Sequence, residues 1–507
     1  MSKDPPSEGK SKGKASSAAK PGPKKKAKTR KKQPKGLAVF TEAGNVPRWI
    51  SAARFVLVLA LAASVPFVIG VEPGRRLFWA AAIASLPLFW VIGGYHLWRR
   101  LCPLAVIAQL GRLFGKPGSR RVNAKSWLAN NYLILQMAIM LVALSLRLIM
   151  TNGTPLALAG FLVAAVVIAI ATGLLYTGKT WCNYICPVGM VEKFYTEPAR
   201  LTGLPNSQCS PCTACKKNCP DIDLEQGYWK EFMLPARRLS YYAWPGIVLA
   251  FYTYFYFVAG DWDYYFSGAW TLEDTQMATW LDPGFFFLGA IPIVAAAPLT
   301  LIAFGAVSVA LFRVLEAAAL SATDKSDVDV ERIRHRTLAT AGFVAFILFY
   351  YFGGQPTIRM LPGWFGALFS TAVVVAATAI FVRRWRRSES DFVQEKFAEK
   401  ILKKWKWGDA PESDSLHDIY LLHHERKKEA DARLGAYKET VREMVADGLL
   451  TRNELALLDA LRAQLGVSDK DHQRVIDELG DEEKQLFDED YQGSIEQRLQ
   501  SDQYRRE

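Results

Sequence analysis

Residues 155–177 read PLALAGFLVAAVVIAIATGLLYT, and GKTWCNYICPVGM follows at once at residues 178–190. The first stretch holds no charged side chain over its 23 positions. A run of about 20 apolar residues is the length that an α-helix needs to cross a bilayer core. The sequence therefore predicts a membrane-spanning helix that ends directly before a cysteine pair, Cys182 and Cys186.

The rest of the chain repeats this apolar pattern. Its hydrophobic content of 50% over 507 residues, gathered into long runs, is too high for an ordinary soluble enzyme. We predict an all-α polytopic membrane protein with about eight transmembrane helices, the last four within residues 239–387. The other apolar runs lie at residues 50–71, 77–95, 128–150, 239–260, 284–313, 337–355 and 362–382.

The loops between these runs alternate in charge. The loops at 96–126, 178–238 and 314–336 are rich in Lys and Arg, whereas the loop at 261–283 is acidic. Lys and Arg are enriched in cytoplasmic loops of membrane proteins. We therefore expect a multi-pass protein of the cell inner (cytoplasmic) membrane, with both termini and the cysteine loop in the cytoplasm.

The N-terminal tail is strongly basic. Residues 1–36 hold thirteen Lys or Arg against two acids, with no aromatic residue to build a core. We predict that residues 1–40 are disordered and bind anionic membrane lipids. A lysine run can also bind nucleic acid, but the adjacent membrane span favours lipid, so no nucleic-acid partner is expected.

A second cysteine motif lies in the loop at 178–238. Cys209, Cys212, Cys215 and Cys219, followed by Pro220, have the C-x2-C-x2-C-x3-C-P spacing of bacterial ferredoxins. Zinc sites favour two separated C-x2-C pairs, and a reducing cytoplasm disfavours disulfides. We predict that residues 178–238 form a cytoplasmic loop that binds a [4Fe-4S] cluster.

An internal repeat connects the cysteines to the helices. Within residues 48–177 we predict two repeated helix pairs, the first of which ends in a Cys-Pro loop at 96–126. In the first copy Trp98 stands where the second copy has Cys182. A shift of 84 residues aligns Gly94 with Gly178, Cys102 with Cys186 and Pro103 with Pro187.

All seven cysteines fall within these motifs, one fewer than two cubane clusters need. In ferredoxins the cysteine before proline ligates the other cluster. Our hypothesis is that Cys209, Cys212 and Cys215 share one cluster with Cys186, which leaves Cys219 and Cys182, with Cys102 as a further candidate ligand. That second set would hold a cubane completed by another ligand such as His96, a three-iron cluster, or reduced thiols.

The cysteine motifs resemble those of the membrane-bound ferredoxin-type proteins of bacteria. The resemblance rests on WCNYICPVG at residues 181–189 and on the run Cys209 to Pro220, and it covers about residues 50–235. This group includes the quinol-oxidising subunit of periplasmic nitrate reductase, the nitrous oxide reductase maturation protein and the oxidase-assembly cupric reductases. It implies cytoplasmic [4Fe-4S] clusters that pass electrons between quinol, or a cytoplasmic donor, and a redox partner. The chain departs from the group at Trp98 and has one full four-cysteine run.

The chain after the last span is polar. We predict that residues 388–507 form a cytoplasmic helical module with an interaction or regulatory role. Capping-box spacing at Thr451 with Glu454, and at Ser468 with Asp471, predicts two helix starts. Gly448 and Gly466 lie where the preceding helices should end.

Some polar and aromatic residues near the spans have two interpretations each. Gln136 could contact a quinone headgroup, but a hydrogen bond between helices is the simpler prediction. Arg54 and Arg147 lie near span ends, where their side chains can extend to the membrane surface. The aromatic residues of the acidic loop, Trp262 and Trp270 among them, are expected to anchor the protein at the interface.

Two functions are consistent with the sequence. The first is a membrane-bound iron-sulfur protein that relays electrons, an oxidoreductase component in contact with the quinone pool or a cytoplasmic donor. The alternative is an iron-sulfur sensor that signals through the C-terminal helical module. No C-x-x-C-H motif for attached haem is present.

Overall fold

The computed structural model describes residues 48–112, 118–123, 125–198, 219–323, 327–404, 432–446, 448 and 450–488. The predicted tail at 1–40 and the predicted ligands Cys209, Cys212 and Cys215 lie outside these residues. Within them the structure has eight helical segments long and apolar enough to cross a membrane. The prediction of a polytopic helical membrane protein is confirmed.

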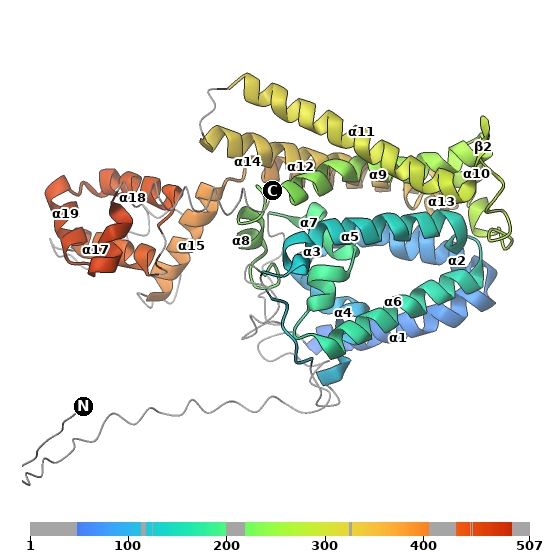
Figure 1. The fold of residues 1–507 in the computed structure, drawn as a ribbon, viewed down its shortest axis with the longest axis horizontal. Helices are drawn as coiled ribbons and strands as arrows, with labels where there is room; N and C mark the ends of the chain where they lie inside the picture. Colours follow the sequence, from blue (N-terminus) through green and yellow to red (C-terminus); the bar gives the residue numbers. More distant parts are fainter. Residues whose placement is uncertain are drawn as a thin grey trace, which may run out of the picture. The chain divides into compact units, whose positions relative to one another are not determined.

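The first four spans, coloured blue to green in Figure 1, cover the residues of the predicted repeat. Each copy is a pair of helices that ends near a cysteine. The second span is continued by short helical pieces on both sides of α3. The elements are α1 (Arg48–Gly70), α2 (Glu72–Leu77), η2 (Phe78–Ile83), α3 (Ala84–Leu101), α4 (Pro103–Ile107), α5 (Trp127–Leu146), η4 (Arg147–Thr151) and α6 (Pro155–Leu175).

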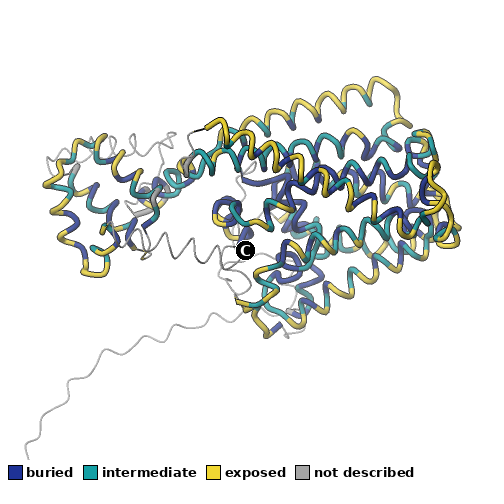
Figure 2. The backbone as a smooth tube through the Cα atoms, turned by 45° about the horizontal axis from the view of Figure 1, so that its top comes forward, coloured by how far each residue is buried: buried dark blue, intermediate teal, exposed yellow. Residues whose placement is uncertain are grey.

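In the last four spans α11 and α12 pack against α9, and α14 packs against α12 (Figure 1). Most of α9 is buried, and it lies against α11 and α12. Gly246 of α9 lies so close to α11 that an added Cβ would be 2.2 Å from the Phe304 carbonyl oxygen, which is how small residues allow membrane helices to approach. Figure 2 shows the buried backbone inside the bundle and exposed backbone on its outer faces. The elements are α9 (Pro235–Ala259), α11 (Ile293–Ser321), α12 (Asp327–Phe352), α13 (Gln355–Ile358) and α14 (Gly363–Arg386).

The sixth span begins later than its apolar run predicts. Residues before Ile293 form a two-stranded hairpin, β1 (Pro283–Phe285) with β2 (Leu288–Pro292). Gly284 and Gly289 are poor helix formers, and Pro292 sits at the helix N-cap in extended conformation. The helix instead extends to Ser321 through residues that favour it.

Two aromatic residues of the acidic loop, Tyr265 and Trp270, pack inward, contrary to the prediction that this set anchors the protein at the interface, whereas Trp262 is partly exposed. The loop contains α10 (Asp263–Phe266) and η6 (Ala269–Thr271). Tyr265 and Trp270 are buried and stacked, and the Tyr265 hydroxyl donates to the Phe352 carbonyl at 3.0 Å. The loop therefore closes one end of the bundle.

The predictions for the two arginines near span ends are also wrong. Arg54 is buried and its Nε donates to the Arg100 carbonyl at 2.7 Å. The guanidinium of Arg147 lies 4.0 Å from the ring centre of Trp79 and 4.6 Å from that of Phe251. Aromatic ring faces attract a cation, and they hold this one inside the bundle.

The C-terminal residues form a helical module with its own apolar core. The predicted caps are confirmed: Thr451 and Glu454 form a capping box, and the Ser468 side chain accepts from the backbone of Asp471. Gly448 and Gly466 have φ of 73° and 66°. The helices are α15 (Glu389–Lys404), α17 (Ala432–Val445), α18 (Arg452–Leu465), α19 (Asp469–Asp477) and α20 (Asp481–Lys484).

Helix α15 belongs to two cores. Phe392, in its first turn, packs in the core of the membrane bundle. Phe397, Ala398 and Ile401, further along the helix, pack in the core of the module. The module predicted at residues 388–507 includes α15, but the packing of its first turn in the membrane bundle was not predicted.

Candidate iron-sulfur site

Cys102 and Cys186 lie in two turns with similar backbone conformations. Gly94 and Gly178 have φ of 79° and 70°, a region open to glycine. Eight residues later Cys102 (φ −52°, ψ 118°) and Cys186 (φ −58°, ψ 118°) adopt the same backbone conformation. A proline follows each cysteine, where a helix start needs no N–H donor. The repeat predicted from the sequence is therefore present in the backbone.

Three cysteines meet where these turns converge. Cys102, Cys182 and Cys186 share one apolar cluster with Ala105, Ala108, Ala169 and Trp181. Cys182 comes from the π-helical segment η5 (Trp181–Ile185), and Cys186 follows it. Gly173 of α6 permits this packing, because an added Cβ would be 1.6 Å from the Ala108 carbonyl oxygen.

Cys219 contacts Asn183, a residue that lies between Cys182 and Cys186 in the chain. The Asn183 amide donates to the Cys219 sulfur at 3.6 Å, and Asp221 lies 3.9 Å from the same sulfur. Cys219 is buried and precedes α8 (Leu224–Trp229). None of these four cysteines is in a disulfide. The structure thus groups Cys102 with Cys182 and Cys186, while the division of the cysteines between clusters stays a hypothesis.

A buried glutamine fixes the turn between Cys182 and Cys186. Gln136 of α5 is fully buried and donates to the Cys186 carbonyl at 2.9 Å and to the Cys182 carbonyl at 3.5 Å. The predicted hydrogen bond between helices is confirmed. Gly189 completes the contact, since an added Cβ would be 2.4 Å from the Cys182 carbonyl oxygen.

Buried charges surround the cysteines. Arg99 is ion-paired with Glu192 of α7 (Val188–Thr196) and lies 4.0 Å from Asp221. Lys179 pairs with Asp221 at 3.2 Å, and Arg99 also donates to the Cys182 carbonyl at 3.4 Å. The sequence did not predict this network, because its partners are joined only in the fold.

The network shifts the pKa values of its two acids, Glu192 and Asp221, in opposite directions. Burial raises the pKa of Glu192 to about 7, although Arg99 opposes the shift. Burial alone would raise the pKa of Asp221, but Lys179 and Arg99 outweigh it and hold that pKa well below its usual range. The two cations therefore stabilise negative charge next to the cysteines.

Burial disfavours the thiolate forms of Cys182 and Cys186. Burial raises the pKa of Cys182, although Arg99 and Lys179 oppose the shift, and burial also raises the pKa of Cys186. Metal binding releases the thiol protons and replaces them with the positive charge of the metal. Iron binding and the nearby cations together would favour the thiolates.

Two hydrogen-bond donors near the cysteines test whether an iron-sulfur cluster fits. Trp181 is only 6% exposed, and its Nε1 has no partner among the described residues. The buried hydroxyl of Tyr95, which interacts electrostatically with Cys219, also has none there. Cluster sulfurs accept such hydrogen bonds. The donor set fits a thiolate-bound cluster with the cysteines as its ligands.

The same residues do not form a site for a single metal ion. No group of three or more His, Cys, Asp or Glu side chains in the described part of the chain is arranged to hold one. A cubane spaces its ligands more widely than one ion does. His96 is buried against Tyr95 and interacts electrostatically with Asp221.

A second set of ion pairs ties the segment after Cys219 to α15 and to Arg387, which lies between α14 and α15. Asp223 pairs with Lys396 at 2.8 Å, and Glu225 pairs with Arg387 at 2.7 Å. Asp223 also caps α8 by accepting from Gln226. Residues four and six positions after Cys219 therefore hold the helix that leads into the C-terminal module.

Comparison with known sequences identifies one domain. The sequence pattern of the 4Fe-4S binding domain family matches residues 158–205. The matched segment runs from α6 through Cys182 and Cys186 to the end of α7 and beyond. No curated protein and no solved structure matched the chain. The chain is a multi-pass helical membrane protein with a ferredoxin-type 4Fe-4S binding domain.

Proposed function

We propose that this protein relays electrons through a [4Fe-4S] cluster at the cytoplasmic face of the inner membrane. The observation that carries the proposal is the meeting of Cys102, Cys182 and Cys186 beside the buried cations Arg99 and Lys179. When bound, the cluster accepts and donates one electron at a time. The protein supplies the thiolates, the compensating charge and the hydrogen-bond donors.

The arrangement of the spans supports the cytoplasmic assignment. Cys102 lies near the end of the second span, and Cys182 and Cys186 follow the fourth, which favours the same side of the membrane as the start of α1. An even number of spans places the end of α14 on that side too. The basic residues of these loops favour the cytoplasm, and the basic tail at 1–40 would bind anionic lipid there.

We propose Cys209, Cys212, Cys215 and Cys186 as the ligands of one cluster. The proximity of Cys102 to Cys182 supports a role for both, with Cys219, in a second site. The donor in this proposal is the quinone pool or a cytoplasmic electron carrier, and the acceptor is a respiratory or maturation partner. The resemblance to membrane-bound ferredoxin-type proteins supports this choice of partners.

Iron and sulfide analysis with paramagnetic resonance tests the ligand assignment. We expect Cys186→Ser to lose the cluster signal, and Cys102→Ser to remove signal only if the second site holds iron. Ala108→Ser is the matched control, because it places a hydroxyl in the same apolar cluster without removing a thiol. Wild-type iron content in both Cys182→Ser and Cys186→Ser would refute the proposal.

The ion pairs of Lys396 and Arg387 with the segment after Cys219 favour a second candidate function, that of an iron-sulfur sensor. A cluster that changes with iron or oxygen would alter that segment, and Lys396 and Arg387 would pass the change to the module. A reduction potential and a quinol-oxidation assay separate the two functions. Reversible cycling indicates relay, whereas oxygen-driven cluster loss that changes hydrogen exchange in the module indicates sensing.

Truncation tests whether the module is needed for cluster assembly. We expect a chain that ends at Lys404, which keeps α15, to retain full iron content. A chain that ends at Glu389 loses the Lys396 pair but keeps all seven cysteines and should also assemble the cluster. Loss of the iron signal in either truncation would contradict this expectation.

A further inference from the structure

A cluster of arginines lies where α12 begins and α14 ends. The guanidinium of Arg336 on α12 lies over the ring of Trp385 on α14, 5.3 Å from the ring centre. Arg332 is one turn before Arg336, and residues four apart share a face of a helix. Arg386 directly follows Trp385 and is exposed. Arg332, Arg336 and Arg386 therefore form an arginine cluster that spans two packed helices.

The charge of this arginine cluster is largely uncompensated. In the described part of the chain no acid pairs with Arg336 or Arg386. The Nε of Arg336 is buried and has no partner there either. Arg332 has one ion pair, with Asp329 at 3.5 Å, and the side chain of Arg332 is 55% exposed. An unsatisfied donor in an apolar setting is costly, so an anionic ligand would be favoured at this cluster.

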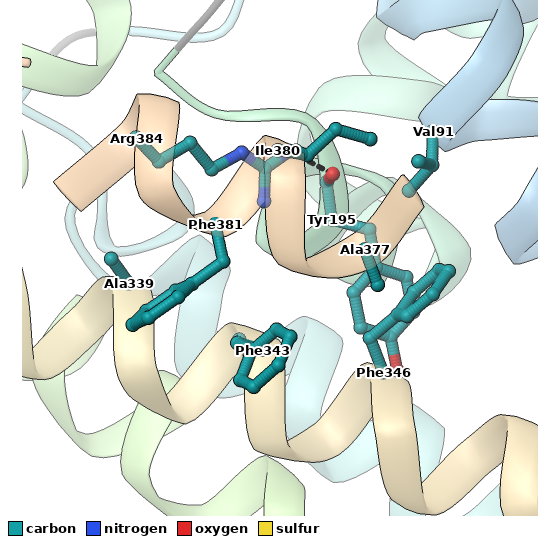
Figure 3. A pocket seen from close by; sticks show the side chains of 10 residues that line it. Val91, Tyr195, Ala339, Phe343, Phe346, Ala377, Ile380, Phe381 and Arg384 are labelled. Carbon is teal, nitrogen blue, oxygen red and sulfur yellow. Dashed lines mark hydrogen bonds between the residues drawn. The ribbon is translucent and has the colours of Figure 1, made fainter. Parts of the chain in front are cut away.

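Other arginines near the end of α14 are satisfied inside the protein. Arg384 is buried, and its terminal nitrogens donate to backbone carbonyls of α7. Figure 3 shows this side chain extending from α14 toward Tyr195. Arg387 is paired with Glu225 at 2.7 Å. The arginine cluster lacks such internal partners, so its ligand must come from outside the described chain.

The contact with Trp385 prepares Arg336 for a phosphate. Aromatic ring faces attract a cation, and an arginine over such a ring keeps the N–H donors at its edge free. These donors form a flat fork that matches the oxygens of a phosphate. Tryptophan is also enriched at the membrane–water interface. Arg336 is therefore held at the depth where phospholipid headgroups lie.

An apolar surface continues from the cluster into the membrane. The rings of Phe343 and Phe381 stack between α12 and α14 with centres 4.6 Å apart, which closes the space between the helices (Figure 3). A ligand must therefore lie on the outer surface. Val375 and Val382, eleven and four positions before Arg386 and on the same face of α14, are 64% and 40% exposed. A charged end and an apolar track thus share one surface.

We propose that Arg332, Arg336 and Arg386 bind the phosphate of an anionic phospholipid, with an acyl chain along Val375 and Val382. Basic sites between membrane helices bind anionic headgroups. Free phosphate would meet the charges but not the apolar track. A zwitterionic phospholipid carries its own cation beside the phosphate, which three arginines disfavour. The site goes beyond the proposed function, since it needs no cluster, and it is separate from the basic tail at 1–40.

Photolabelling in lipid nanodiscs tests the site. Full-length protein is embedded in phosphatidylcholine with a small fraction of phosphatidylglycerol that carries a photoreactive diazirine near its headgroup. Mass spectrometry then maps the labelled peptides. We expect labels at the start of α12 and in the last turn of α14, removed by unlabelled phosphatidylglycerol but not by phosphatidylcholine. Arg336→Gln and Arg386→Gln should each lower this labelling roughly fivefold when the labelled lipid is scarce.

Arg313→Gln is the matched control. Arg313 is exposed on α11, near the end that leads into α12, so its loss removes the same charge near the same membrane surface. This variant should label like the wild type. Thermal unfolding verifies that all variants are folded.

The outcomes separate this inference from the proposed function. Labelling that survives both glutamine substitutions, or that Arg313→Gln lowers equally, overturns the site. Displacement by phosphatidylcholine, or by inorganic phosphate alone, overturns the choice of an anionic phospholipid. The Cys186→Ser protein should label like the wild type, so a failure of the cluster assignment would leave the lipid result readable.

Discussion

Replacing Gln136 by leucine should weaken cluster retention more than it weakens the fold. The substitution removes the amide that donates to the Cys186 carbonyl at 2.9 Å and to the Cys182 carbonyl at 3.5 Å. These bonds are the described side-chain ties between α5 and the turn that carries both cysteines. Without them the turn is still held by its own backbone, by Arg99, by the Asn183 amide on the Cys219 sulfur and by the packing of Tyr132 against Tyr184.

The size of the expected effect of Gln136→Leu follows from the hydrogen bonds that remain in the variant. The Cys186 carbonyl still accepts from Gly189 at 3.0 Å, so no buried acceptor is left bare. One net hydrogen bond contributes about 1 kcal/mol. The Oε1 of Gln136 has no partner among the described residues, and its removal offsets part of that loss. We expect the fold to lose less than about 1 kcal/mol, whereas loosening the turn by about 1 kcal/mol would speed iron release roughly fivefold.

Gln276→Leu is the matched control at the opposite end of the bundle. Gln276 donates to the Leu148 carbonyl at 2.8 Å and accepts from Gly153 at 2.9 Å, so the variant loses two good bonds. Its melting temperature should fall further than that of Gln136→Leu, while its iron release rate should match the wild type. Release is followed by chelator absorbance and stability by thermal unfolding in detergent. If Gln276→Leu releases iron as fast as Gln136→Leu, the local explanation is wrong.

Three further predictions follow from packing and charge. Gly189→Ala should displace the cysteine turn at a cost of about 1–3 kcal/mol, seen as reduced iron content in freshly purified protein. Arg237→Met should lower stability by about 3–5 kcal/mol, because it leaves the buried carboxylate of Glu197, now 2.6 Å from Arg237, without its partner; thermal unfolding measures this. Lys396→Met should cost less than about 1 kcal/mol, since its pair with Asp223 is partly exposed; hydrogen exchange in α15 should rise while iron content stays unchanged.

The membrane spans were predictable because a bilayer requires long apolar runs. The run at 155–177 corresponds to α6 within two residues at its end. The run at 284–313 predicted the start of α11 less well. Hydropathy does not distinguish the hairpin of β1 and β2 from the first turns of a helix. Helix caps in the module were predictable because their chemistry is local, as at Thr451.

The cysteines were predictable from spacing, but their surroundings were not. Arg99 and Glu192 are 93 positions apart, and only the fold brings them together. Arg147 was misplaced for a related reason: a charge near a span end ordinarily reaches water, but here Trp79 and Phe251 present ring faces nearby. Sequence patterns identify groups that can react, while long-range contacts decide which of them meet.

The turns at Cys102 and Cys186 have the same shape but offer different numbers of cysteine ligands. Both copies of the duplication have the same bend, yet one presents two thiols and the other presents one thiol and an indole. The backbone that leads to the bend also differs, because Trp98 lies in α-helix α3 whereas Cys182 lies in the π-helical segment η5. Trp98→Cys would therefore add a thiol to this half without supplying the π-helical turn, and the iron content of that variant would show which of the two a cluster requires.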